Sequence, residues 1–539
     1  MALRNEPVPM PEKKVTFKTG PNGTVYVYLT LRAYRNKEGK PTSEEAAIGK
    51  KDPLTGMLIP NRRYFELFHA PTSATKKSIT DANPSPTCRV ASCGNSFFLM
   101  GIARETGLQR ILSKCFPESW PQILATAFYM LCEGNVMMYI EDWFDETDLS
   151  FVGRMDDQQC SRLFSAISHG ERMHFFKEWV KLRSEQEYIA YDVTSVSTYS
   201  EGIDIAEWGY NRDGESIPQV NLGMFYGSES NLPVYYNLYN GSISDKGHLP
   251  FMMAGAEKLG ITNTRFVLDR GFVTEDNLKY MEDNKYLFVT AFPQHLLESK
   301  RLIDANKGSI RRSANRVGAH GVYALPIDID IYGFKMKAHI YFDPEKQALD
   351  EKALYAHIDR LGADLEKMGK TKRVTKKYID FFVVGQEKSG TVSFQLDNGK
   401  IDERLNRAGF YILVSNDDSL DSADVLNIYR GKDVIEKNFD HLKNGLDFKR
   451  LRTHVNRTTD GKVFVGFLAL ILRSYLLRKV KNSKELKNST LEKVLLELRK
   501  IRYVTFEDLS RLLTPITRKQ RIIIEALGFS TKDLFDSFS

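Results

Sequence analysis

The sequence has few cysteines and no long hydrophobic run, and both shortages narrow the class of protein. Only five of the 539 residues are cysteine, all in the N-terminal third, with no C-x2-C pair and no histidine at zinc-ligand spacing. A structural zinc site is therefore not expected, and reduced thiols fit a cytosolic protein. The longest apolar run, Val463 to Leu472, is far shorter than the about 20 residues that span a bilayer.

A secretion signal and a clear helix-turn-helix motif are also missing. Residues Met1 to Thr16 are charged and Pro-rich and contain no apolar core, so we expect a soluble, cytoplasmic protein with no membrane partner. The formal net charge is +7, from 76 Lys and Arg against 69 Asp and Glu. This mildly basic balance permits a polyanionic partner without requiring one.

The patterns along the chain change character several times and predict five regions. Residues 1–80 read as a small β-rich region with a strand at Thr24 to Leu31, and Lys76 to Pro86 reads as a polar linker. Residues 84–185 carry helical periodicity, with helices expected at Phe97 to Leu112, at Pro121 to Met138 and from Met155 toward Leu182.

Strand patterns begin abruptly near residue 186. Three segments separated by turns predict an antiparallel meander: Tyr188 to Val196, Pro218 to Gly227 and Pro233 to Gly241. A helix, a strand at Thr264 to Asp269, a further helix and a strand at Tyr286 to Phe292 follow. Three antiparallel strands followed by alternating helix and strand are the order of a ribonuclease-H-like α/β fold.

Residues 295–408 interrupt this domain, which we expect to cover 186–294 and 409–478. The interruption combines a charged helix (Gln347 to Lys370) with several strands, two of them at Gly321 to Pro326 and Asp328 to Tyr332. Two basic clusters flank it and suit either a solvated surface or phosphate contacts; they include Arg311, Arg312, Lys372 and Arg373. A helical, basic C-terminal region is expected at 479–539.

Two aspartates stand out because they occupy strand patterns. Asp192 lies inside an apolar or hydroxylic strand, and Asp269 ends the strand Phe266, Val267, Leu268. An unpaired carboxylate in a half-buried strand costs several kcal/mol unless it is hydrogen-bonded or bound to a cation. Two of them in one domain suggest a shared cation, although Asp269 could instead cap the turn that Arg270 begins.

A long helix predicted at 422–446 presents one carboxylate among an aromatic and two cations. Tyr429, Lys432, Glu436 and Lys443 would fall within roughly a 60° arc of a regular helix. Glu436 and Lys432 could also be an ordinary surface pair worth about 0.2–0.5 kcal/mol. Two further acids lie near this arc and could compete for a metal role: Asp433 and Asp440.

The order Asp192, Asp269-Arg270-Gly271-Phe272, then Tyr429-x2-Lys432-x3-Glu436-x6-Lys443 resembles the DDE transposases of bacterial insertion sequences. It is most similar to the group with a Y-x2-R-x3-E-x6-K signature and a β-rich insertion before the glutamate. The resemblance covers residues 187–480 well and 84–186 loosely. One position departs from it: Lys432 replaces the signature arginine, with Arg430 two residues away, and lysine keeps the charge but loses the bidentate fork for phosphate.

The resemblance implies a ribonuclease-H-like catalytic domain with a β-rich insertion, a helical N-terminal region of packing or DNA-end binding role, and a helical C-terminal tail. It implies that Asp192, Asp269 and Glu436 bind two Mg²⁺ ions, for which Mn²⁺ can substitute, with Asp192 bridging both. The expected DNA contacts are Tyr429, Arg430, Lys432, Lys443, Arg311, Arg312, Lys372 and Arg373.

The implied activity is metal-dependent cleavage at the transposon ends, followed by transfer of the 3′-OH strand into target DNA. The implied partners are the terminal inverted repeats, the target DNA and a second protomer in a synaptic homodimer, with the protein associated with the nucleoid through DNA. Three alternatives stay open. They are a ribonuclease-H-like nuclease without strand transfer, a catalytically inactive transposase-derived DNA-binding protein, and a phosphatase built on Asp192-x-Thr194, which lacks the second aspartate of a D-x-D pair.

Overall fold

The computed structural model describes residues 7–12, 14–21, 23–35, 40–68, 88–183, 188–261, 265–367, 375–386, 392–506 and 510–536. By its internal contacts the chain divides into two compact units, Met1–Cys88 and Arg89–Ser539. The predicted linker at Lys76 to Pro86 lies outside the described residues.

The N-terminal unit is a four-stranded antiparallel sheet with one short helix. Its strands follow each other in the order β1-β2-β3-β4; they are β1 (Val15–Thr19), β2 (Val25–Arg35), β3 (Pro41–Lys51) and β4 (Leu58–Pro60), with helix α1 at Arg62–Phe68. The strand expected at Thr24 to Leu31 is confirmed as the first part of β2. A small core of Val27, Leu29, Ile48 and Leu58 holds the unit together.

A nine-stranded mixed sheet organises the larger unit, in the order β11-β12-β13-β16-β10-β9-β6-β7-β8. Its strands are β6 (Tyr188–Ser197), β7 (Gln219–Gly227), β8 (Pro233–Asn240), β9 (Arg265–Leu268), β10 (Leu287–Ala291), β11 (Arg316–Val317), β12 (Val322–Ile331), β13 (Phe334–Phe342) and β16 (Phe410–Ser415). The predicted meander is confirmed, because β6, β7 and β8 pair antiparallel. Strands β9 and β10 then continue the sheet in parallel with β6.

The two strands predicted at Gly321 to Pro326 and Asp328 to Tyr332 are one strand, β12, and that prediction is wrong. Pro326 lies within β12 and pairs with His339 of β13. On its other side β12 pairs only with the two-residue strand β11, through Tyr323 and Val322. A proline is tolerated there because its missing N–H faces no partner strand.

In the described part of the larger unit, six α-helices precede the sheet: α2 (Gly94–Glu105), α3 (Leu108–Cys115), α4 (Trp120–Glu133), α5 (Ile140–Glu146), α6 (Asp157–Ala166) and α7 (His169–Lys181). The helix predicted at Phe97 to Leu112 is two helices, because Gly107 takes a left-handed φ of 77° between α2 and α3. The helix expected from Met155 toward Leu182 is also two, since Ser168 and Glu171 form a capping box that starts α7.

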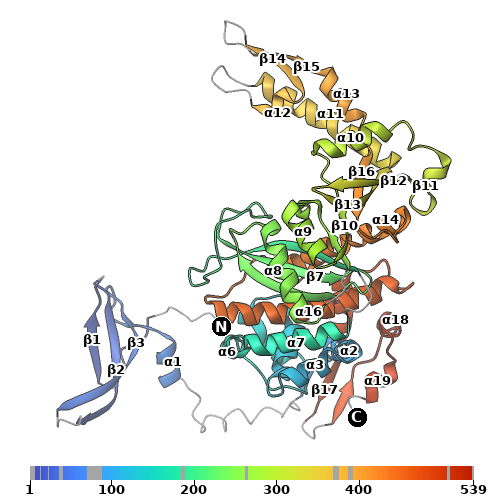
Figure 1. Cartoon of the computed structure of the whole chain (residues 1–539). Coiled ribbons are helices and arrows are strands. Elements are labelled where there is room, and N and C mark those ends of the chain that lie inside the picture. Colours follow the sequence, from blue (N-terminus) through green and yellow to red (C-terminus); the bar gives the residue numbers. More distant parts are fainter. Residues whose placement is uncertain are drawn as a thin grey trace. The chain divides into compact units, whose positions relative to one another are not determined.

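The apolar helix predicted at 461–478 is the central part of α16 (Asn456–Asn482), which joins these helices to the sheet. It contacts α4 and α6 on one side and β8 on the other (Figure 1). A Cβ at Gly461 would lie 2.0 Å from the Phe164 carbonyl oxygen, so only glycine permits this close approach to α6. The helices and the sheet share one hydrophobic core, which gives residues 94–181 a packing role.

The interruption of the domain contributes two different structures. Strands β11 to β13 extend the central sheet, because β13 pairs with β16. The remainder has its own small core, built around Ile358, Leu361 and Phe382; its elements are α11 (Pro344–Glu366), α12 (Lys376–Ile379), β14 (Phe382–Gln386), β15 (Val392–Leu396) and α13 (Asn398–Leu405). Helix α10 (Leu297–Asn306) precedes both, and helices α8 (Asp245–Lys258) and α9 (Glu275–Asp283) flank β9 in sequence.

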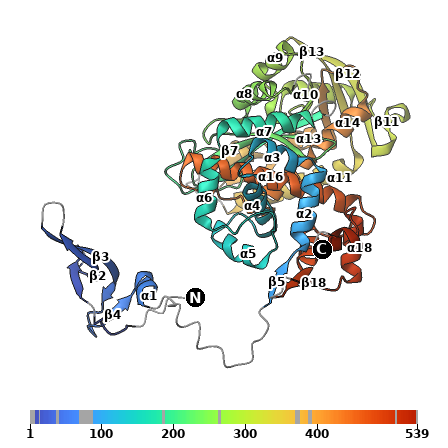
Figure 2. The same ribbon diagram turned by 90° about the horizontal axis from the view of Figure 1, so that it is seen from below.

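The C-terminal region is only partly helical. It contains α17 (Leu491–Arg499), β17 (Arg502–Thr505), β18 (Arg511–Leu513), α18 (Arg518–Ala526) and α19 (Thr531–Asp536). Strand β17 pairs with β5 (Arg89–Ser92). Figure 2 shows β5 leading directly into α2. Among the described helices none is by itself both long and apolar enough to cross a membrane, and α4 together with Met137–Glu146 meets that test only as a pair bent by 104°.

Candidate functional site

Asp192 lies in the middle of β6, opposite Met224 of β7. Its side chain is 17% exposed, and its Oδ1 accepts a hydrogen bond of 2.8 Å from the Val193 amide. Burial raises the pKa of Asp192, while the positive charges of Arg212 and Lys432 act in the opposite direction. The carboxylate therefore depends on nearby cations to stay ionised.

Asp269 lies beside Asp192 because of the strand register. Strands β6 and β9 run parallel and end their pairing at Tyr191 opposite Leu268, so the next residue of each strand is an aspartate. A 3-10 turn, Arg270–Phe272, follows Asp269 and takes the chain away from the sheet. The proximity also shows electrostatically, since the charge of Asp269 helps to raise the pKa of Asp192.

Lys432 connects this pair to the third predicted acid. Its Nζ lies 3.1 Å from Asp269 Oδ1 and 3.6 Å from Glu436 Oε1, and the residue is 5% exposed. Burial works to lower the pKa of Lys432, but the charges of Asp269 and Asp192 outweigh it and raise that pKa. The buried ammonium group of Lys432 thus contacts Asp269 and Glu436 directly, and Asp192 lies close enough for its charge to act on Lys432.

The prediction of a single helix at 422–446 is wrong. The segment is α14 (Ser422–Gly431), then α15 (Asp433–Asp440), then a π-helical turn at His441–Gly445. At the junction the Lys432 amide bonds the Tyr429 carbonyl and the Ile435 amide bonds the Lys432 carbonyl, which are tight three-residue steps. Gly431, a weak helix former, lies at this break.

The altered helix geometry separates the four residues that a regular helix would align. Tyr429, Lys432 and Glu436 stay together, and burial is the main cause that raises the pKa of Tyr429. Lys443 lies in the π-helical turn and is buried, with its Nζ 2.6 Å from Asp213 Oδ2. Its partner belongs to the segment between β6 and β7, not to the cluster around Lys432.

A cavity of about 310 Å³ opens beside the two aspartates. Its lining includes Asp192, Asp269, Tyr210, Arg212, Asp245 and Lys246. Arg212 Nη2 lies 2.5 Å from Asp245 Oδ2 and 4.0 Å from Asp192 Oδ1, so it is a second cation next to the candidate acids. Sequence patterns gave no sign of Arg212 or Asp245, because both lie outside the regular strand segments.

The side chains of this site suit a hard divalent cation, because they are carboxylates. Two of them, Asp269 and Glu436, already contact the same positive group, the Lys432 ammonium. Within the described part of the chain, however, no three histidine, cysteine or acidic side chains close on one point. Of the two acids considered as competitors, Asp433 is exposed, and Asp440 Oδ1 accepts a hydrogen bond from Asn444.

The remaining predicted DNA contacts lie away from the carboxylates or outside the described residues. Arg430 is exposed and contacts His320, with 2.8 Å between Nη1 and Nδ1. Arg311 lies over the Phe342 ring at 5.2 Å, and Arg312 is exposed. Lys372 and Arg373 fall outside the described residues.

Comparison with known proteins places this arrangement in context. The family model described as the transposase DDE domain matches residues 183–472, a range that contains every strand of the large sheet. A cryo-EM structure of a piggyBac transposase synaptic complex with hairpin DNA is similar over 70% of each chain, with 11% sequence identity and a TM-score of 0.35. None of the curated proteins matches the chain.

Proposed function

Because the transposase DDE domain accounts for more than half of the sequence, this chain belongs to that family, and we propose that it cuts the ends of its own DNA element and joins them to target DNA. The observation that carries the proposal is the gathering of Asp192, Asp269 and Glu436 around Lys432. These are the three acids, in the order expected for an insertion-sequence transposase with the Tyr-Lys-Glu-Lys form of the signature.

The sheet supports a ribonuclease-H-like core for this activity. Strands β8, β7 and β6 are antiparallel, and β9 and β10 follow in parallel with β6. This topology brings Asp192 of β6 and Asp269 after β9 to adjacent positions. The insertion lies between β10 and β16, so Glu436 reaches the site only after the chain returns through β16.

We propose Mg²⁺, with Mn²⁺ as a substitute, as the cation of the site. When bound, two such ions activate the attacking hydroxyl and stabilise the leaving oxygen of a phosphodiester. In this proposal the carboxylates of Asp192, Asp269 and Glu436 would hold the ions, and Asp192 would contribute to both. Without metal, the Lys432 ammonium lies among these carboxylates. The positive charge of a bound metal ion would repel this ammonium and favour its turning toward a DNA phosphate.

The other predicted DNA contacts have separate roles in this proposal. Tyr429 lies next to Lys432 and, with Arg430 of the same helix, positions the DNA end, and Arg311, Arg312, Lys372 and Arg373 contribute phosphate contacts from the insertion. For Lys443 we propose that it positions the segment between β6 and β7, because its ammonium is buried against Asp213 of that segment. The partners are the terminal repeats, the target DNA and a second protomer of the same chain, in the cytoplasm on the nucleoid.

Substitution of each acid tests the proposal. In Mg²⁺, D192N, D269N and E436Q are each expected to reduce nicking of a plasmid that carries the element ends by at least about a hundredfold, since each loses several kcal/mol of charge stabilisation. DNA binding, measured by anisotropy, stays near that of the unsubstituted chain.

D433N is the matched control, because Asp433 is an exposed acid on the same helix, and it should retain nicking. Loss of nicking in D433N together with retention of nicking in E436Q would show that the proposal assigns the metal to the wrong acid. A strand-transfer assay then separates a transposase from a nuclease that cuts without joining, and full DNA binding without nicking by the natural chain would identify an inactive derivative.

A further inference from the structure

The β6–β7 loop (residues 198–218) exposes three large aromatic side chains. Tyr199 is 75% exposed, Trp208 66% and Tyr210 85%. A single exposed aromatic on a surface needs no explanation, but three within one loop beside a cavity do. Of the four tryptophans in the sequence, Trp143 and Trp179 are buried and Trp120 is partly buried, which leaves Trp208 as the exposed one.

The backbone of this loop is held firmly where Trp208 and Tyr210 lie. Glu207 and Gln219 exchange two backbone hydrogen bonds of 3.0 Å, and the Gln219 side-chain amide donates to the Tyr210 carbonyl at 2.9 Å. A Cβ at position 209 would lie 1.9 Å from the Gly241 carbonyl oxygen, so Gly209 is packed against the sheet. Its two neighbours, Trp208 and Tyr210, expose their side chains to solvent.

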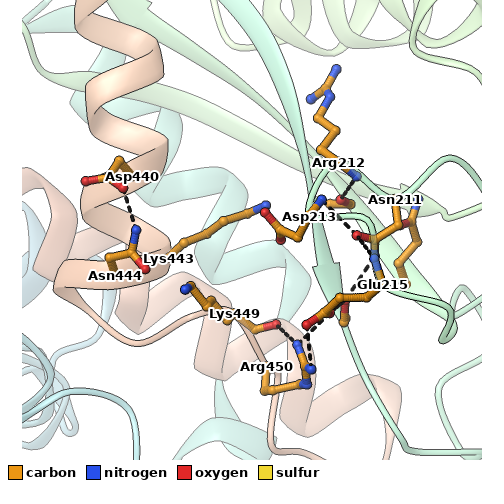
Figure 3. Close-up of polar contacts among 12 residues, drawn as sticks. Asn211, Arg212, Asp213, Glu215, Asp440, Lys443, Asn444, Lys449 and Arg450 are labelled. Carbon is orange, nitrogen blue, oxygen red and sulfur yellow. Dashed lines mark hydrogen bonds and ion pairs between the residues drawn. The ribbon is translucent and has the colours of Figure 1, made fainter. Parts of the chain in front are cut away.

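Charged contacts fix the second half of the loop (Figure 3). Asp213 receives the buried Lys443 ammonium at 2.6 Å. The two terminal guanidinium nitrogens of Arg450, Nη1 and Nη2, donate to Glu215, each at 2.7 Å. The Arg212 amide donates to Ser195 Oγ of β6 at 3.1 Å. Exposure of the two aromatics is thus built into an ordered loop and does not follow from local looseness.

The position of Tyr210 connects these aromatics to the candidate acids. Tyr210 and Arg212 line the same cavity as Asp192 and Asp269, together with Lys246. A ligand that covers the Tyr210 ring therefore comes close to the carboxylates. Aromatic rings next to cations are the combination that binds unpaired nucleotides, because each base offers a flat face for stacking and each phosphate a negative charge.

We propose that Trp208 and Tyr210 form a stacking platform for unpaired bases of the DNA strand whose phosphate reaches Asp192 and Asp269. The inference rests on the proposed function, since it assigns DNA to the cavity. Within a duplex the faces of internal bases are covered by their neighbours, so the platform selects bases that have left the stack. It adds to the site a preference for single-stranded or frayed DNA that the carboxylates alone do not supply.

Binding measurements on the full chain without divalent metal test the platform. The probes are a short single-stranded oligonucleotide of mixed sequence and the blunt duplex of the same sequence. The binding of each probe is measured by fluorescence anisotropy. The single strand is expected to quench the fluorescence of Trp208, with W208F identifying the signal. Y210A and W208A should each weaken single-strand binding at least about fivefold, as expected for the loss of one stacked base, and change duplex binding less than twofold.

Two further variants sharpen the result. Y210F keeps the ring and should bind like the unsubstituted chain. Y355A removes another exposed tyrosine, on α11, and should leave both affinities unchanged. The proposal is overturned by unchanged single-strand affinity in Y210A and W208A, by equal losses for duplex and single strand, or by no binding of either probe. Because no cleavage is measured, failure here leaves the test of the three acids intact.

Discussion

At the scale of single residues, Lys462 is the clearest source of pH-dependent stability. It lies on α16, is 2% exposed, and its Nζ is 3.4 Å from the Arg452 carbonyl oxygen and 3.5 Å from Asn135 Oδ1. Burial lowers the pKa of Lys462 to about 7, and Arg452 adds to that effect while Asp447 and Cys160 oppose it. The folded chain therefore releases this proton far more readily than an unfolded chain does.

This difference fixes the sign of the expected pH effect. Between about pH 7 and pH 10 the unfolded chain holds a proton on Lys462 that the folded chain has lost, so stability rises with pH across that window and is flat below it. K462M should remove the rise and increase the free energy of unfolding at pH 7 by the order of a few kcal/mol. Urea unfolding over this pH range measures it, with exposed Lys481 on the same helix as the control in K481M. Equal slopes in the two variants would contradict the assignment.

The same scale shows what sequence patterns reveal about the site. Asp192 and Asp269 could be singled out because a carboxylate within an apolar strand is unusual, and the register of β6 and β9 then places them side by side. Arg212 could not be singled out, because polar residues between strands usually mean solvent exposure. Its contacts with Asp245 and Asp192 depend on how the loop folds back on the sheet.

At the scale of elements, the helical segment around Glu436 differs most from its prediction. Periodicity alone predicts one helix for 422–446, and it carries no signal for the tight step at Lys432 or for the π-helical turn at His441–Gly445. Both irregularities redirect side chains. The first leaves Lys432 in contact with both Asp269 and Glu436, and the second brings Lys443 to Asp213.

The pair of Lys443 and Asp213 should therefore couple the π-helical turn to the β6–β7 loop. The Lys443 side chain is 9% exposed and that of Asp213 33%, so D213N leaves a buried charge unpaired whereas K443M leaves a carboxylate that water can reach. D213N is expected to be the more destabilising, by about 1–3 kcal/mol, and the double variant to show coupling of about 0.5–3 kcal/mol. Thermal and urea unfolding give both quantities. Strictly additive losses would mean that the pair does not join the two elements.

At the scale of the whole molecule, local sequence patterns predict where the strands lie better than they predict which strands pair with each other. The strands predicted between Tyr188 and Phe292 follow each other along the chain in the expected order. Each of them carries a hydrophobic pattern of its own, and most pair with a strand that is close in sequence. The addition of β11 to β13 to the same sheet was not predictable, because it depends on the pairing of β13 with β16 across a long stretch of chain. Alternation within β13 does not specify which edge it joins.

The separate cores of the two units lead to a prediction about the full chain. Among the described residues of Met1–Cys88 the buried hydrophobic core consists of Val27, Leu29, Ile48 and Leu58, and so small a core rarely supplies more than about 3–5 kcal/mol. Arg89–Ser539 has the large shared core of the sheet and helices. Removal of residues 1–87, which keeps β5 with its partner β17, should abolish the weaker calorimetric transition and leave the stronger one within about 2 °C, a shift that corresponds to about 2 kcal/mol for a unit of this size. A larger fall in the remaining transition would show that the N-terminal unit stabilises the rest of the chain.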